Sequence, residues 1–255
     1  MSEESRPLLV SRDGQIVTLT LNRPRVRNAV SHQLLESMER TLDDLARERP
    51  WVILLRASTP GFCAGIDLKE TLDADPAFVR DRVSTMHRVL RKLRSIPVPI
   101  VAAIDGPAVG LGVELAISAD LRFASAASRF SYREVAVAVP SPAHHLVRVI
   151  GLTRAQDLLL TARWMEADEA ERVGLVTRLV PDAEAAAADA ARQIAELAPR
   201  AVQDTKENIW ISVRQGVDAA ALHHIDVVAT AALTEDRREA LTAFREKRPP
   251  RYAGR

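Results

Sequence analysis

Two glutamates stand beside apolar stretches of the chain, where a carboxylate is costly to bury without a partner or a function. Glu114 lies about one helical turn beyond Leu111, and Glu134 precedes a run in which every second residue is valine. A pair of carboxylates can act as general acid and general base. Two such groups in one poorly solvated pocket do not both ionise easily, so one should hold a proton near neutral pH. Arg133 could instead neutralise Glu134 in a structural ion pair.

Glu114 follows a glycine-rich turn within residues 100–120. Residues 100–104 have the length and the branched side chains of a buried strand. The glycines that follow let a ligand approach the backbone closely, and the first N–H groups of a helix lack intrahelical partners. Such a turn can hold an oxygen that carries negative charge. It is no phosphate loop, because Gly-Lys-Ser/Thr is absent, and the spacing of a dinucleotide-binding fingerprint fails at Leu115.

A second glycine-containing turn follows another predicted strand. Residues 51–57 have the composition of a buried strand and lead into Ser-Thr-Pro-Gly-Phe-Cys-Ala-Gly-Ile-Asp-Leu-Lys at 58–69. Gly61 and Gly65 lie there just ahead of polar residues that could begin a helix. The chain therefore places a strand ahead of a glycine-containing turn twice.

The hydrophobic pattern of the first 195 residues predicts an α/β fold. Residues 8–21 alternate as a hairpin with its turn at Asp13-Gly14, and further strands are expected near 51–57, 99–104, 121–125 and 176–180. Ser31 is expected to cap a helix that runs to residue 48, and Pro76 to open one toward residue 94.

Beyond residue 199 the pattern predicts helices only, over residues 201–213, 216–232 and 235–246. Amphipathic helices that have no sheet of their own need another surface to cover.

Composition indicates an ordinary globular protein. The 255 residues are 47% hydrophobic, enough to bury one sizeable core, and the net charge of +1 gives no overall field that attracts nucleic acid or a membrane. Cys63 is the only cysteine, so no intramolecular disulfide can form. No run is long enough to span a bilayer, and residues 1–5 lack the features of a targeting signal, so the cytoplasm is the expected compartment. The histidine pairs are adjacent in the chain and seldom face the same way, so no metal site is expected.

Four segments in order carry a resemblance to a known family: Asn22-Arg-Pro with Asn28-Ala29, residues 62–69, residues 100–120, and residues 234–239 with 244–248. On these motifs the chain resembles the enoyl-CoA hydratase/isomerase (crotonase) superfamily almost from end to end. The resemblance implies an α/β fold with a crotonase-like ββα superhelix, or spiral, as a core over residues 1–195 that holds the acyl-CoA site. It also implies a C-terminal all-helical trimerisation region over residues 196–255. That region would pack on the core or on a neighbouring subunit, in a homotrimer or a dimer of trimers.

The resemblance also implies the roles of the reacting groups. The backbone N–H groups of Ile66 and Leu111 would hold the thioester oxygen as an oxyanion hole, so the side chains there are free to vary. Glu114 and Glu134 match the two glutamates that hydratases of the family use on water. No metal is implied, and no cofactor, since coenzyme A is part of the substrate.

The implied substrate contacts lie in the same turns and in the tail. Lys69 would contact a phosphate of the coenzyme, and Lys247 would reach the coenzyme of an adjacent subunit. The full set of implied substrate and coenzyme contacts is Arg25, Ala64, Ile66, Asp67, Leu68, Lys69, Gly110 and Lys247.

The implied activity is that of an enoyl-CoA hydratase, which adds water to a 2-enoyl-CoA thioester in fatty acid β-oxidation or related acyl-CoA catabolism. A Δ3-Δ2-enoyl-CoA isomerase is the alternative, but it moves one proton and needs only the carboxylate at Glu134. A catalytically silent acyl-CoA binder, or a scaffold that binds RNA through the basic tail, would not require both glutamates. The tail offers only Tyr252 for stacking on bases.

The chain departs from the family pattern near the expected acyl chain. Ser131-Tyr-Arg133 replaces the commoner Gly-X-Pro, and residues 139–146 contain two prolines and two histidines in place of a glycine-rich loop. His144 or His145 could touch the acyl group, or serve only as an ordinary residue at a helix start. These departures leave the substrate's acyl chain open.

Overall fold

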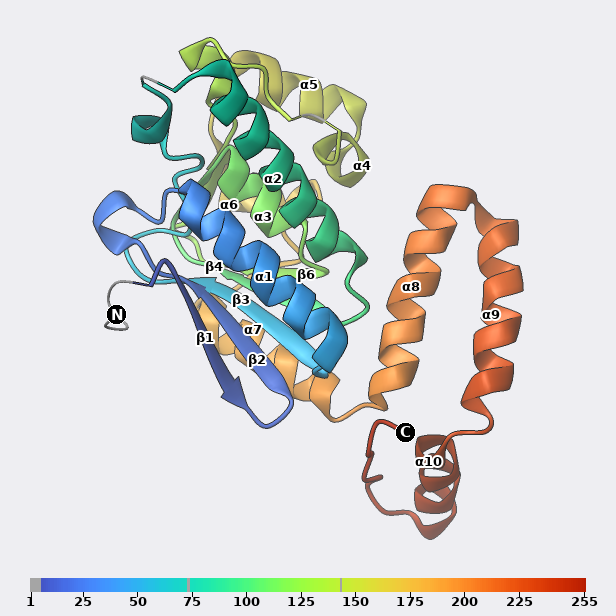
Figure 1. Cartoon of the computed structure of the whole chain (residues 1–255). Helices are drawn as coiled ribbons and strands as arrows, with labels where there is room; N and C mark the ends of the chain where they lie inside the picture. The colour runs from blue at the N-terminus through green and yellow to red at the C-terminus, as the bar shows by residue number, and fades with distance from the viewer. Residues whose placement is uncertain (1–5, 73, 143) are drawn as a thin grey trace.

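A mixed six-stranded sheet forms the centre of the computed structural model, which describes residues 6–72, 74–142 and 144–255. Its strand order is β1-β2-β3-β4-β6-β9 (Figure 1). The strands are β1 (Leu8–Asp13), β2 (Ile16–Leu21), β3 (Val52–Ala57), β4 (Ile100–Ile104), β6 (Leu121–Ala124) and β9 (Arg178–Leu179). β1 and β2 form the predicted antiparallel hairpin, and all later pairs are parallel, so these predicted strands are confirmed. The expectation for residues 1–5 lies outside the described residues.

A second, smaller sheet has the order β5-β7-β8. Its strands are β5 (Pro107–Val109), β7 (Arg129–Ser131) and β8 (Met165–Glu166). β5 and β7 are parallel, β7 and β8 antiparallel, and an isolated bridge joins Cys63 to Ala108 on β5. The hydrophobic pattern did not predict this sheet, because strands of two or three residues are too short to show a period of two.

The chain visits the two sheets in turn and then forms a helix. β4 in the larger sheet is followed by β5 in the smaller sheet and by α3 (Leu111–Ile117). β6 and β7 repeat this order ahead of α4 (Leu146–Ile150) and α5 (Leu152–Thr161), as do β3, the Cys63 bridge and α2 (Pro76–Ser95). Each repeat is one ββα turn, so the expected ββα superhelix is confirmed.

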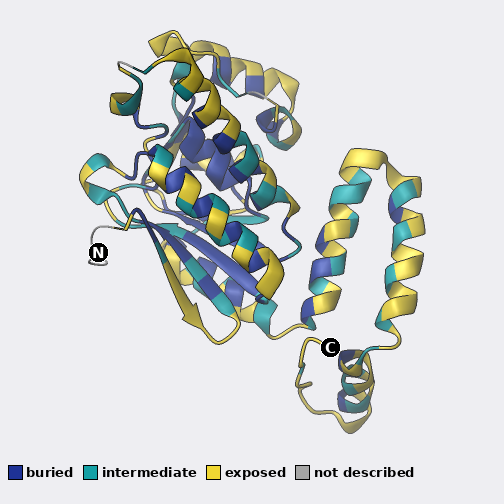
Figure 2. Ribbon diagram, viewed as in Figure 1, coloured by how far each residue is buried: buried dark blue, intermediate teal, exposed yellow. Residues whose placement is uncertain are grey.

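Helices cover both faces of the larger sheet (Figure 1). α1 (His32–Glu48), α2 and α3 pack on one face, where they share a core with Leu19, Ile53 and Leu55. The alternate residues Val52 and Leu54 contact α7 (Ala183–Ala195) on the other face, and α6 (Ala167–Arg172) lies by the smaller sheet. Figure 2 shows buried residues concentrated in the sheet and on the inner sides of these helices.

The predicted helix starts are confirmed by their caps. Ser31 Oγ accepts a hydrogen bond from the Leu34 N–H at 3.1 Å, and Pro76 occupies the first turn of α2. Asp75 caps the same helix through the N–H groups of Ala77 and Phe78. Short 3₁₀ helices occupy three connections: η2 (Pro24–Val26), η3 (Leu68–Thr71) and η4 (Glu134–Val137).

The last part of the chain is helical, as predicted: α8 (Pro199–Gln215), α9 (Val217–Ala231) and α10 (Glu235–Glu246). α8 is tied to the core by Lys206, whose Nζ lies 2.7 Å from Asp120 Oδ2 and 2.9 Å from the Val98 carbonyl. α9 runs back along the outer side of α8, and α10 lies beyond their ends (Figure 1). The division at residue 195 into two domains stays a prediction.

Candidate active site

Two strands of the smaller sheet, β5 and β7, and the segment bridged to β5 at Cys63 bring the predicted residues to one edge. Cys63, Ala108 and Phe130 are bridged side by side in parallel register. Ile66 and Leu111 each come three residues after these partners, and Glu134 comes four residues after Phe130. Because the carboxyl ends of adjacent parallel strands open at the same edge, the register places both turns and Glu134 together.

Backbone hydrogen bonds hold the two turns against each other. The N–H groups of Phe62 and Cys63 donate to the Pro107 carbonyl at 3.1 Å, and the Val109 N–H donates to the Cys63 carbonyl at 2.9 Å. Gly65 has φ +89°, and a Cβ there would lie 2.8 Å from the Val109 carbonyl oxygen and 3.8 Å from the Leu111 nitrogen. Only glycine lets the first turn approach the second this closely.

The N–H groups of Ile66 and Leu111 are both free. The bridge between Val30 and Ile66 uses the N–H groups of Val30 and Asp67 and leaves that of Ile66 unused. Leu111 is the first residue of α3, so its N–H has no partner within the helix. Within the described residues neither group donates to a protein acceptor. Two free donors on adjoining turns can bind one oxygen and stabilise charge that develops on it.

Glu114 is fully buried on α3. Its Oε1 accepts a hydrogen bond from the Tyr132 hydroxyl at 2.6 Å, while its Oε2 has no partner among the described residues. Burial raises the pKa of Glu114 to about 7, which the Tyr132 hydrogen bond and the charge of Arg94 counteract and the charge of Glu134 assists. This carboxyl can therefore gain or lose a proton near neutral pH.

Glu134 opens η4 with its carboxylate against the second turn. A Cβ on Gly110 would lie 2.2 Å from Glu134 Oε1, so the carboxylate occupies the space that this glycine leaves. Ser141 Oγ donates to Glu134 Oε2 at 3.2 Å, and burial raises the pKa of Glu134. Arg133 donates to the Ala162 carbonyl at 2.8 Å rather than to Glu134.

His144 and His145, in the loop that departs from the family pattern, have different surroundings. His145 is buried beside α3, where its Nε2 lies 3.1 Å from the Ile117 carbonyl and burial lowers its pKa to about 4. His144 is exposed, and its ring centroid lies 5.2 Å from that of His87. His145 is thus a packed residue at the start of α4, and an acyl contact of His144 stays a prediction.

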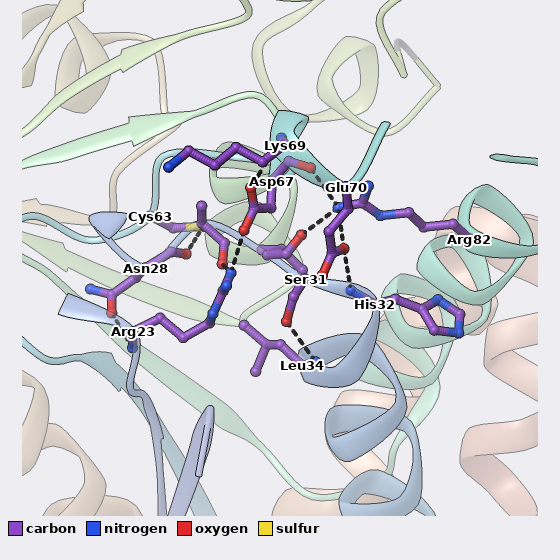
Figure 3. A network of polar contacts seen from close by, with 12 residues as sticks. Arg23, Asn28, Ser31, His32, Leu34, Cys63, Asp67, Lys69, Glu70 and Arg82 are labelled. Carbon is purple, nitrogen blue, oxygen red and sulfur yellow. Dashed lines mark hydrogen bonds and ion pairs between the residues drawn. The ribbon is translucent and has the colours of Figure 1, made fainter. Parts of the chain in front are cut away.

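The predicted coenzyme contacts of the first turn are mostly exposed. Ala64, Leu68 and Lys69 are exposed beside Ile66. Asp67 is buried, and its carboxylate pairs with Arg23 at 2.9 Å and accepts the Lys69 N–H at 3.2 Å (Figure 3). The Asp67 carboxylate therefore supports the turn, and a further role on the coenzyme stays a prediction.

Two predicted contacts lie farther from Ile66 in the sequence. Arg25 is exposed on η2, which follows β2. Lys247 ends α10 in the left-handed conformation, and Figure 1 shows α10 well away from α3. One chain thus does not bring Lys247 to its own site, in keeping with the predicted contact between subunits.

A buried arginine that the sequence did not single out supports the first turn. Arg82 on α2 is 1% exposed, and its Nη2 donates to the carbonyls of Val30 and Asp67 at 2.8 and 3.1 Å. Val30 and Asp67 belong to the two segments that the bridge at Ile66 joins, and Glu70 pairs with the same guanidinium (Figure 3). A buried arginine of this kind has no sequence signal beyond a charge on the apolar side of a helix.

Cys63 has a structural position at the edge of the site. It is buried, its Sγ donates to the Asn28 carbonyl at 3.2 Å, and burial raises its pKa to about 12. A thiol of this kind is not a nucleophile at neutral pH. The part of the chain that the structure describes contains no group of three or more His, Cys, Asp or Glu side chains able to hold a metal ion.

Comparison with known proteins identifies the family of this chain. The family model described as enoyl-CoA hydratase/isomerase matches residues 11–255. A mitochondrial methylglutaconyl-CoA hydratase of Mus musculus is 34% identical over 94% of this chain and 80% of its own length, and a short-chain-enoyl-CoA hydratase of Clostridium acetobutylicum is 31% identical over 96% and 97%. The crystal structure of an enoyl-CoA hydratase from Bacillus anthracis superposes with a TM-score of 0.94 at 33% identity, covering 98% of this chain and 100% of the other. With its ββα spiral and its two glycine-containing turns, the chain belongs to the enoyl-CoA hydratase/isomerase family of the crotonase superfamily.

Proposed function

We propose that this protein is an enoyl-CoA hydratase, a hydro-lyase that adds water in syn fashion across the α,β double bond of a 2-enoyl-CoA thioester to give a 3-hydroxyacyl-CoA. The observation that carries the proposal is the unpartnered Oε2 of buried Glu114, close to Glu134 and to the second turn. A buried carboxylate oxygen without a partner is costly unless a ligand or water meets it. The hydratase names of several relatives support the same reaction.

The chemistry follows from the positions of these groups. The thioester oxygen accepts hydrogen bonds from the N–H groups of Ile66 and Leu111, which stabilise the enolate-like charge as it develops. Glu114 takes a proton from water while the water oxygen bonds to the β carbon. Glu134 delivers a proton to the α carbon, and the two carboxyl groups then exchange one proton through the next water, which restores the starting state.

The raised pKa values of Glu114 and Glu134 fit a pair of carboxyl groups that share one proton. One carboxyl must start ionised and the other protonated, which two adjacent buried acids achieve by sharing one proton. The Tyr132 hydrogen bond and Arg94 favour the ionised form of Glu114. Burial raises the pKa of Glu134 as well, and the hydrogen bond from Ser141 Oγ lowers it, so either carboxyl can hold the shared proton. We assign the base to Glu114, whose Oε2 has no partner among the described residues and can meet water, and the acid to Glu134.

The isomerase alternative is less well supported. Shifting a double bond needs one carboxylate that removes and returns a proton, and Glu134 alone would serve. A second buried carboxylate with its own hydrogen-bond donor has no task in that reaction. A silent acyl-CoA binder would need neither buried acid, since burial of a carboxyl costs free energy.

Turnover of two isomeric substrates tests the assignment. The protein is expected to hydrate crotonyl-CoA, measured as loss of the enoyl-thioester absorbance, faster than it converts a 3-enoyl-CoA to the 2-enoyl isomer. Mass spectrometry should show one water added to the crotonyl-CoA product. Faster conversion of the 3-enoyl substrate would favour the isomerase, and no turnover of either would favour the silent binder.

The helical region also has a proposed role, in assembly as a homotrimer or a dimer of trimers. Support comes from large apolar side chains that one chain leaves exposed on α9 and α10, among them Leu222, Ile225 and Phe244, which are 68%, 64% and 83% exposed. Such a patch on a protein surface usually marks an interface. In this assembly Lys247 would reach the coenzyme of the neighbouring subunit.

Light scattering tests the assembly. The mass in solution is expected to be three or six times the chain mass of 28.0 kDa. Leu222→Glu combined with Ile225→Glu should lower it, because two charges would be buried at the interface. Glu196→Ala, at an exposed position at the end of α7 and outside α9 and α10, is the control and should leave the mass unchanged. A monomeric wild-type protein would contradict the proposal.

The remaining parts of the proposal concern substrate, cofactor and compartment. The reaction requires no cofactor or metal, since coenzyme A is part of the substrate, and it would serve fatty acid β-oxidation or related acyl-CoA catabolism. No helix within the described ranges is long and apolar enough to cross a membrane. We place the protein in the cytoplasm; its single, buried cysteine gives no support to an oxidising compartment.

A further inference from the structure

Tyr132 lies against one of the reacting groups, and so far only its effect on the charge of Glu114 has been described. It follows β7, is 0% exposed, and has its hydroxyl 2.6 Å from Glu114 Oε1. A buried tyrosine hydroxyl is costly without a partner, and here the partner is a buried carboxyl that is itself costly. Tyr132 also lies in the segment where the chain departs from the commoner Gly-X-Pro.

We propose that Tyr132 is a positioning residue that fixes the Glu114 carboxylate so that Oε2 alone meets the substrate water, and that its hydrogen bond keeps this carboxylate ionised as the base. The proposal rests on the proposed hydratase function. It assigns a task to a residue that neither holds the thioester nor touches the acyl group.

The geometry supports this division between the two carboxylate oxygens. Tyr132 occupies Oε1, and Oε2 is buried without a partner among the described residues. The hydrogen bond resists rotation about the last side-chain bond of Glu114, which is otherwise soft. When Glu114 takes a proton from water, that proton therefore binds to Oε2. Burial and the neighbouring Glu114 raise the pKa of Tyr132, so the phenol stays protonated and remains a donor throughout.

Two charged groups besides the Tyr132 hydroxyl influence the ionisation of Glu114. Arg94 on α2 favours the ionised carboxylate, and Glu134 on η4 opposes it. Arg94 itself donates to Ser118 Oγ at 3.3 Å rather than to Glu114. Among the described residues Tyr132 is the one side chain that donates a hydrogen bond to the Glu114 carboxylate. Hydrogen bonds to charged groups are strong enough to shift a pKa by about one to two units.

The effect of removing the Tyr132 hydroxyl on the pKa of Glu114 can therefore be predicted both in direction and in size. Without the donor, the pKa of Glu114 rises above its value of about 7, so the base is protonated over more of the neutral range. In Tyr132→Phe the acidic limb of kcat/KM for crotonyl-CoA is expected to move about one pH unit higher. Activity at pH 7 should fall about fivefold and recover toward the wild-type value at alkaline pH.

Tyr252→Phe is the matched control, because Tyr252 is the only other tyrosine and lies in the C-terminal tail. Its pH profile should match that of the wild type. In a Glu114→Gln background the Tyr132→Phe change should have little further effect, since no carboxylate remains to be held. 3-Fluorotyrosine, whose phenol is a stronger donor, gives the opposite test: the acidic limb should move to lower pH.

Several results would overturn the proposal. A Tyr132→Phe profile that keeps the wild-type limb, or a loss equal at every pH, would show that Tyr132 only packs. Should Tyr132→Phe fail to fold, as judged by thermal unfolding, the fluorotyrosine protein decides, and an unmoved limb there rejects the idea. If the wild type and Tyr252→Phe both fail to hydrate crotonyl-CoA, the proposed function itself is wrong and this inference fails with it.

Discussion

Glu114→Gln is expected to lower the rate of crotonyl-CoA hydration by about 10²–10⁴-fold, because the amide cannot take a proton from water. Glu134→Gln should lower it by a similar factor, since the α carbon then has no proton donor. In the wild type the rate should fall as the pH drops below about 7, where Glu114 becomes protonated and ceases to be a base. Stopped-flow or steady-state rates over a pH series measure all three effects.

Glu196→Gln provides the control for these changes. Glu196 is exposed at the end of α7 and lies outside both turns, so its replacement should leave the rate unchanged. Circular dichroism should show that each variant keeps its fold. Wild-type turnover in Glu114→Gln would remove the basis of the hydratase proposal, and a loss confined to Glu134→Gln would point to the isomerase.

Gly112→Ala should lower kcat by about 10²-fold through the backbone alone. A Cβ on residue 112 would lie 2.4 Å from the Cys63 carbonyl oxygen and 2.8 Å from Cys63 Cβ, so the two turns would have to move apart. The N–H groups of Ile66 and Leu111 would then no longer meet one oxygen. Since alanine favours a helix more than glycine does, the loss would not come from α3 itself.

Gly174→Ala separates this effect from ordinary glycine strain. Gly174 has φ +80°, and the nearest atom to a Cβ there is the Val149 carbonyl oxygen at 4.0 Å. That variant should lose stability and keep its kcat, whereas Gly112→Ala should lose kcat. Thermal unfolding and steady-state kinetics on both proteins give the comparison. An unchanged kcat in Gly112→Ala would mean that contact between the turns does not matter for turnover.

The larger sheet could be predicted from the sequence, and the smaller sheet could not. The strands at 52–57 and 100–104 are apolar runs long enough to recognise, and Ser31 and Pro76 mark where helices begin. β5 has three residues, and its partners lie elsewhere in the chain. Pairing of such short strands depends on the tertiary fold, which the local sequence does not encode.

The candidate site shows the same division. The two turns and the two glutamates could be identified from residue types and order, and the structure places them at one edge of the smaller sheet. The residues that support them could not, because each acts across a long stretch of chain. Arg82 donates to a carbonyl 52 positions earlier, and Tyr132 to a carboxylate 18 positions earlier. Sequence separations of this length produce no periodicity and no local motif from which the contact could be predicted.

The position of Arg82 links the mobility of the first turn to that of a helix. α2 is held on α1 by ion pairs of Arg88 and Lys92 with Glu39, and its Arg82 donates hydrogen bonds to the carbonyls of Val30 and Asp67. Any local opening that moves α2 away must break these two hydrogen bonds. Amide exchange at Asp67, whose N–H donates to the Val30 carbonyl, should therefore follow the opening of the helix rather than the fluctuation of a surface loop.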